Sequence, residues 1–144
     1  NGGKPACFLD VGGGATEESV YEALTLISKM KNVKAILVNL YGGIVKTTIV
    51  ASAFIKAYDN KLIDLPVYAR LMGAESEKSK EMLKDTKTKM FSSVEQAING
   101  VVMEVTKTGW YFWTAKREKE CGRKLWKAAS YSSRHHGKIW FCAY

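Results

Sequence analysis

This 144-residue chain contains two glycine-rich turns whose residue types and positions are typical of a ligand-binding site. Gly12-Gly13-Gly14 and Gly42-Gly43 each follow an apolar run and precede a segment with helical periodicity. Glycine lets the backbone approach a ligand closely, and the free amide groups and dipole at the start of a helix attract an anion. The two turns therefore predict a site for a phosphate or carboxylate group.

Neither turn alone matches a common nucleotide-binding motif. Glu17 stands where the third glycine of a Gly-x-Gly-x-x-Gly motif belongs, and Lys46 does not directly follow a glycine, as it would in a Walker loop. Taken in isolation, each turn could equally serve only to reverse the chain. The assignment therefore depends on the segments around them.

The turns belong to a regular alternation of strand-like and helix-like segments. Apolar runs predict strands over residues 6–11, 35–40, 65–71 and 89–91. Helical spacing predicts one helix capped by Thr16, one from Ile44 to about Tyr58 that is largely enclosed, one over Ser76–Lys84, and one that begins with a Ser92–Glu95 capping box. Such alternation predicts an α/β fold with a parallel sheet, helices on both faces and both glycine turns at the rim beyond the carboxyl ends of the strands.

Three segments in the correct order closely resemble the carboxyl-terminal ligase domain in the β subunit of succinyl-CoA synthetase. They are residues 2–16, residues 34–45 (the strand and turn Lys-Ala-Ile-Leu-Val-Asn-Leu-Tyr-Gly-Gly-Ile-Val) and residues 65–71. The resemblance covers about residues 1–105. It implies a flavodoxin-like, doubly wound parallel sheet with flanking helices.

The resemblance also implies a function. In that family an α and a β subunit together convert succinyl-CoA, a nucleoside diphosphate and phosphate to succinate, CoA and a nucleoside triphosphate. The phosphorylated histidine and the CoA site belong to the α subunit, so no catalytic residue is expected in this chain. By resemblance Gly42, Gly43, Ile44 and Val45 bind substrate or phosphate between the subunits, through backbone donors that stabilise a phosphoryl group electrostatically.

Secondary contributions to the site are expected from Gly12, Gly13, Gly14, Asn39 and Arg70. Arg70 could reach an anion at the sheet rim or could form a salt bridge. Asn39, a polar residue in an apolar strand, could orient substrate or could tie loops together.

The chain departs from the family pattern in several positions. Lys46, Thr47 and Thr48 follow the second turn in place of the usual residues, and Met72 replaces a usual Glu. The family's ATP-grasp domain, which binds ATP or GTP and magnesium, is expected upstream of Asn1, so we do not expect this chain to be active alone. The choice between ADP and GDP lies in that domain. The expected compartment is the mitochondrial matrix in a eukaryote and the cytoplasm in a bacterium.

Composition limits the other possibilities. The chain is 47% hydrophobic and 25% charged, which is typical of a globular domain, and no apolar run is long enough to span a membrane. Cys7, Cys121 and Cys142 form no CxxC pair, and His135 and His136 have loose spacing to Cys142, so we expect neither a disulfide framework nor a metal site.

The extension over residues 106–144 differs sharply in composition from residues 1–105. It carries nine Lys and Arg against two Glu, a net charge of +7 out of the total +8, and all four Trp. We expect it to be poorly packed, and we expect the melting behaviour to be unchanged when residues 107–144 are removed. Two alternatives to a ligase remain open. The chain could be a non-catalytic binding module that uses the same anion site. It could also bind nucleic acid through the basic, aromatic-rich extension, although no recognition motif supports a nucleic-acid partner.

Overall fold

The computed structural model describes residues 3–12, 14–41, 45–107 and 138–143 of the chain. Strands and helices alternate along most of this sequence, which confirms the α/β class. The elements in chain order are β1 (Cys7–Val11), α1 (Glu17–Ser28), β2 (Ile36–Tyr41), α2 (Thr47–Asp59), β3 (Val67–Met72), α3 (Ser76–Met82), β4 (Thr88–Met90), α4 (Val94–Lys107) and β5 (Lys138–Ala143).

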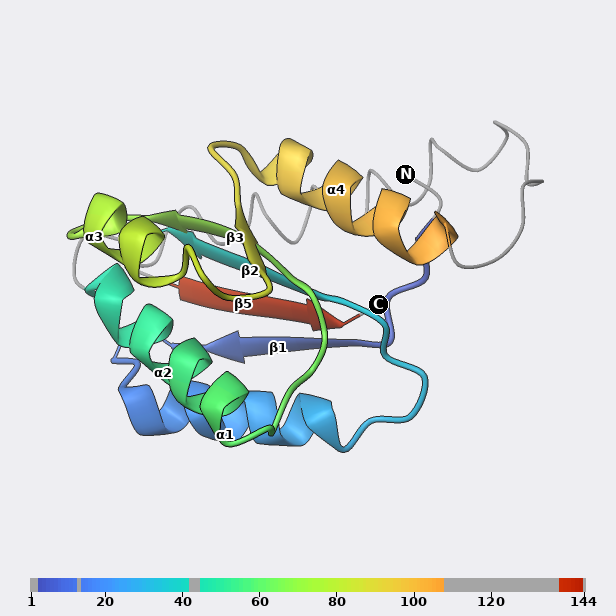
Figure 1. The fold of residues 1–144 in the computed structure, drawn as a ribbon, viewed down its shortest axis with the longest axis horizontal. Coiled ribbons are helices and arrows are strands. Elements are labelled where there is room, and N and C mark those ends of the chain that lie inside the picture. Colours follow the sequence, from blue (N-terminus) through green and yellow to red (C-terminus); the bar gives the residue numbers. More distant parts are fainter. Residues whose placement is uncertain (1–2, 13, 42–44, 108–137, 144) are drawn as a thin grey trace.

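The described strands form one five-stranded sheet in the order β1-β5-β2-β3-β4 (Figure 1). β2, β3 and β4 run parallel to one another. β5 is antiparallel to both of its neighbours, so β1 and β2 point in the same direction. The carboxyl ends of β1, β2 and β3 therefore meet at one rim, where the two glycine turns follow.

β5 comes from the extension, and the expectation of poor packing does not hold for it. Residues 138–143 pair with Cys7–Val11 on one side and with Ile36–Tyr41 on the other. A central strand satisfies its backbone amides and carbonyls through both neighbours, which holds it in the sheet whatever its composition. Residues 108–137 lie outside the described residues, and the domain boundary near residue 105 stays a prediction.

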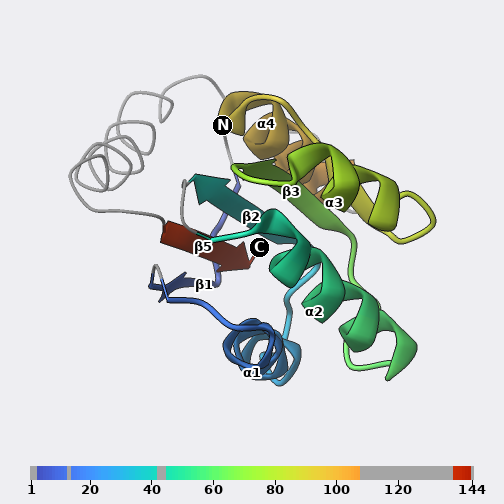
Figure 2. The same ribbon diagram turned by 90° about the vertical axis from the view of Figure 1, so that its left-hand side faces the viewer.

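Helices cover both faces of the sheet, with α4 above it and α1 and α2 below it in Figure 1; Figure 2 shows the same layers from the side. One core lies under α1, α2 and α3 and includes the buried side chains of Leu24, Phe54 and Leu83. A smaller core joins α4 to Leu37 and Tyr68 on the other face. This two-faced cover is the doubly wound arrangement that the alternation predicts.

Polar caps define where two of the helices begin. Thr16 caps α1 as predicted: its Oγ1 accepts from the Ser19 amide at 3.2 Å, and the Ser19 hydroxyl accepts from the Thr16 amide at 2.9 Å. The Ser92–Glu95 capping box is wrong by one residue, because the Gln96 amide donates to Ser93 Oγ at 3.1 Å. The Phe91 amide still bonds to β3, at 2.8 Å from the Ala69 carbonyl, so the chain leaves the sheet too late for a helix to begin at Ser92.

Candidate functional site

The candidate site lies at the rim where β1, β2 and β3 end. Of the residues predicted to line this site, four lie outside the described residues: Gly13, Gly42, Gly43 and Ile44. The structure describes the remaining five, which are Gly12, Gly14, Asn39, Val45 and Arg70. The geometry of the site is therefore described by the first turn, the start of α2 and the ends of β2 and β3.

The first glycine turn is a tight reversal with open space around it. The Ala15 amide donates to the Gly12 carbonyl at 3.1 Å, which closes a four-residue turn. A Cβ atom built on Gly12 or Gly14 would meet no atom within 4 Å, and neither residue has a positive φ. The described chain itself thus does not require glycine at these two positions, and a ligand or partner backbone has room to approach.

The start of α2 differs from the prediction. The helix begins at Thr47 rather than Ile44, and the Val45 side chain before it is buried. The Thr47 amide donates to the Ala74 carbonyl at 3.1 Å, and the Thr47 hydroxyl donates to the same carbonyl at 2.9 Å. Because the chain's own carbonyl occupies this amide, it is not available to an anion, and an anion site at this rim depends on the turn that precedes Thr47.

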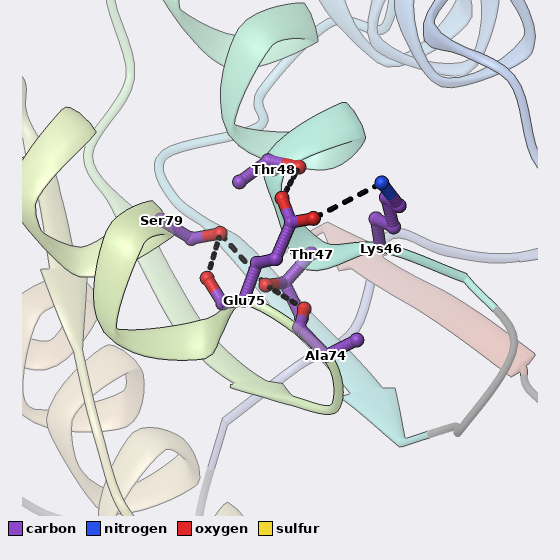
Figure 3. A network of polar contacts seen from close by, with 6 residues as sticks. All are labelled: Lys46, Thr47, Thr48, Ala74, Glu75 and Ser79. Carbon is purple, nitrogen blue, oxygen red and sulfur yellow. Dashed lines mark hydrogen bonds and ion pairs between the residues drawn. The ribbon is translucent and has the colours of Figure 1, made fainter.

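A small polar network holds the loop after β3 against the start of α2 (Figure 3). The hydroxyl of Ser79 donates to Thr47 Oγ1 at 2.7 Å, and both side chains are fully buried. Glu75 adopts a left-handed conformation with φ of 65° and caps α3 with its backbone. A buried hydrogen bond in a region of low dielectric fixes geometry strongly, so α2 and α3 start from one shared anchor.

The side chain of Glu75 lies over the first turn of α2. Thr48 Oγ1 donates to Glu75 Oε2 at 2.8 Å, and Lys46 Nζ lies 3.1 Å from Glu75 Oε1. The hydrogen bond from Thr48 and then the one from Lys46 lower the pKa of Glu75 below that of an ordinary glutamate. The first turn of α2 therefore already faces one negative charge, from within the chain.

Asn39 and Arg70 meet at the ends of β2 and β3. They are opposite each other in the parallel register, and Arg70 Nη1 donates to Asn39 Oδ1 at 3.1 Å. The Arg70 guanidinium also lies 5.3 Å from the centre of the Tyr41 ring, and its Nη2 is 2.8 Å from Met72 Sδ. All three partners are neutral, so the positive charge of the guanidinium is not compensated by them.

Two further facts mark Arg70 as a candidate anion ligand. Among the described residues no carboxylate forms an ion pair with it, and its buried Nε finds no acceptor there. A buried donor without a partner is uncommon and asks for an explanation. The sequence left open whether Arg70 reaches an anion or forms a salt bridge, and no salt bridge of Arg70 occurs within the described chain. The Asn39 side chain instead orients its guanidinium.

Asn39 and Arg70 do not share a face of the sheet with α2. Leu37 and Tyr68 pack under α4, and side chains alternate along a strand, so Asn39 and Arg70 point to the α4 side. α2 packs on the opposite face. The two parts of the site can act on one ligand only at the rim itself, where the strands end.

Three residues of this site were missed by sequence reasoning: Thr47, Glu75 and Ser79. Their roles depend on contacts between segments 27 to 32 residues apart. The one signal in the sequence was the pair Thr47-Thr48 a few residues after the glycine turn, since hydroxyl side chains at a helix start tend to hydrogen-bond to backbone groups. The partner segment could not be identified from it.

The described residues hold no obvious place for a metal ion. No group of three His, Cys, Asp or Glu side chains in that part of the chain is arranged to hold one. Cys121, His135 and His136 lie outside the described residues. None of the helices that the structure describes is long and apolar enough to cross a membrane.

Comparison with known proteins assigns the sequence of this chain to a family. The chain is 51% identical over 89 residues to the succinate–CoA ligase [ADP-forming] β subunit of Francisella tularensis subsp. tularensis, and 49% identical over the same length to that of subsp. novicida. These matches cover 62% of this chain but only 23% of each relative. A model of the family described as CoA-ligase matches residues 1–102. The chain therefore belongs to the CoA-ligase family.

Proposed function

We propose that this chain is the carboxyl-terminal ligase domain of a succinate–CoA ligase β subunit. The proposal is supported by the family match over residues 1–102 and by the similarity to relatives with that printed name. The chain spans about a quarter of their length, so it supplies one part of the reaction. That reaction converts succinyl-CoA, a nucleoside diphosphate and phosphate to succinate, CoA and a nucleoside triphosphate.

The observation that carries the proposal is the uncompensated Arg70 at the rim. Its guanidinium is oriented by Asn39 Oδ1 at 3.1 Å and backed by the Tyr41 ring, while its buried Nε has no acceptor among the described residues. A guanidinium forms two parallel hydrogen bonds with a carboxylate or phosphate group, and it gains most where part of its hydration is already lost. Arg70 therefore suits succinate or phosphate at the sheet rim.

The glycine turns complete the binding half-site in this proposal. Gly42, Gly43, Ile44 and Val45 would offer backbone amides in front of α2, and Gly12, Gly13 and Gly14 would let the other backbone approach closely. A companion α subunit would bring the phosphohistidine and CoA. ATP or GTP with magnesium would bind to an ATP-grasp region of the β subunit.

Co-expression tests the proposal. The chain is produced with the α subunit of a Francisella succinate–CoA ligase, and complex formation is measured by size-exclusion chromatography with light scattering. Turnover is then measured after addition of the ATP-grasp portion of the same β subunit. We expect a complex and restored turnover, with turnover reduced by Arg70→Gln and retained by Lys78→Gln, a matched change of an exposed cation. No complex with the α subunit would contradict the proposal, and a complex without turnover would favour the binding-module alternative.

A further inference from the structure

The thioether of Met72 lies against the guanidinium of Arg70 at the end of β3. Met72 is the last residue of this strand and follows Arg70 by two positions, so both side chains point to the same face of the sheet. Arg70 Nη2 is 2.8 Å from Met72 Sδ. Because a thioether sulfur is only a weak acceptor of hydrogen bonds, this contact is a poor substitute for an oxygen partner.

The guanidinium of Arg70 is fixed with one edge satisfied and the other not. Asn39 Oδ1 accepts from Nη1 at 3.1 Å, and the centre of the Tyr41 ring lies 5.3 Å from the guanidinium carbon. Nε and Nη2 share the other edge of this planar group. Nη2 meets the sulfur of Met72, and the buried Nε has no acceptor among the described residues. An oxygen atom carried by the Met72 side chain would supply the acceptor that this edge lacks.

Met72 is open to small oxidants, since the residue is 41% exposed. A hydroperoxide converts such a thioether to a sulfoxide. The sulfur lone pair attacks one peroxide oxygen, and an S–O bond forms as the O–O bond breaks. The second oxygen takes up the proton of the first and leaves as water or an alcohol. Sulfur is thereby oxidised by two electrons and the peroxide is reduced by two, so the step needs no other reactant.

We propose that Met72 is an oxidation site and that Arg70 captures its sulfoxide, which switches off anion binding by Arg70. The sulfoxide oxygen carries a partial negative charge and accepts strong hydrogen bonds from a guanidinium, because the donor is charged. It occupies Nη2 and Nε, the donors that a carboxylate or phosphate group needs. The switch rests on the proposed function, in which Arg70 binds an anion, whereas the capture of the sulfoxide does not depend on it.

Treatment of the full chain with hydrogen peroxide tests the capture. Peptide mass spectrometry locates the oxidised methionines, and NMR follows the Nε–H signal of Arg70, which is assigned by its absence from Arg70→Lys. Met72→Leu removes the sulfur and keeps an apolar side chain of similar size. Met103→Leu is the matched control, because Met103 is 60% exposed and lies on α4. Oxidation should move the Arg70 signal downfield in the unaltered chain and in Met103→Leu, but not in Met72→Leu.

Succinate titrations of the same samples test the switch. We expect succinate to bind about tenfold more weakly to the oxidised chain, the effect of losing one hydrogen bond with a charged group. In Met72→Leu the affinity should be the same before and after peroxide. Treatment of the oxidised chain with the two stereospecific methionine sulfoxide reductases should restore both the Arg70 signal and the affinity, because each enzyme reduces one sulfoxide epimer.

Four outcomes would overturn the inference, and they differ in what they imply. Oxidation of Met103 with Met72 left untouched refutes Met72 as an oxidation site. An oxidised Met72 with an unmoved Arg70 signal refutes the capture but leaves the anion site of the proposed function intact. An equal loss of affinity in oxidised Met72→Leu assigns the effect to another residue and refutes the switch. If succinate binds none of the proteins before oxidation, that anion site and the switch both fail, while the Arg70 signal still decides the capture.

Discussion

Replacing Phe141 with proline tests whether β5 is a working part of the sheet. Phe141 pairs with Leu9 of β1 and with Val38 of β2, at the middle of the strand. Proline removes a backbone donor, and in a central strand no solvent-facing edge can accommodate the loss. The change therefore acts on both neighbouring strands through the backbone.

The expected cost follows from the ladder. Loss of one net hydrogen bond costs about 1 kcal/mol, and a carbonyl left buried without a donor costs about 1–3 kcal/mol more. The sum, about 2–4 kcal/mol, is a large part of the roughly 5–15 kcal/mol that stabilises a domain. At about 4 °C per kcal/mol for a chain of this size, the melting temperature should fall by about 10 °C.

The assay compares Phe141→Pro with Phe141→Leu by thermal unfolding followed with circular dichroism. The leucine variant keeps the amide and an apolar side chain, so the difference between the two variants reports the backbone contribution. Hydrogen exchange should show loss of protection in β1 and β2 for the proline variant. If the two variants melt within about 2 °C of each other, a shift worth well under 1 kcal/mol, β5 does not hold the sheet together and the reasoning from its position is wrong. That result would restore the expectation that residues 107–144 can be removed without effect.

Three other substitutions give expected outcomes of different kinds. Gly100→Ala in α4 should lower the free energy of unfolding in urea by about 1–3 kcal/mol, although alanine has the better helix propensity, because the new Cβ would lie 2.9 Å from Tyr68 Cδ1 and 3.1 Å from Phe91 Cζ. The control is Met103→Ala, a change of an exposed side chain on the same helix. Equal stability of the two variants would contradict the close packing of Gly100. Thr47→Val and Ser79→Ala should each cost about 1–2 kcal/mol, and the double variant should cost less than their sum; full additivity would show that the 2.7 Å bond between them contributes nothing. Burial raises the pKa of Tyr58, whose hydroxyl donates to the Leu65 carbonyl at 3.1 Å, so folding favours the neutral form of this side chain. The stability that results is fully present below the pKa of an unfolded tyrosine. It is lost as the pH rises through the pKa of Tyr58 in the folded chain. In melting curves above about pH 10, Tyr58→Phe should therefore lose less stability than the unaltered chain, and parallel curves would refute this assignment.

Local patterns were sufficient to predict the four helices and the first four strands. In α2 the apolar positions Val50, Ala53, Phe54 and Ala57 are all buried, as the enclosing pattern predicts. Periodicity succeeds here because one face of each element must lie against the sheet. Element ends were less accurate, since the first helical residue depends on which backbone carbonyl or side chain happens to satisfy its amide, as Ala74 does for Thr47.

The amino-acid sequence determined the alternation of strands and helices, the family and the identity of Asn39, Arg70 and the glycine turns as candidate site residues. The tertiary structure alone decided the pairing of β5, since backbone hydrogen bonds are the same for every residue and carry no mark of the partner strand. It also decided that Asn39 bonds to Arg70 and that Glu75 lies over α2, because both contacts follow from strand register and from one left-handed residue. Such contacts join segments about 30 residues apart, and their distance in space is set only when the whole sheet has formed.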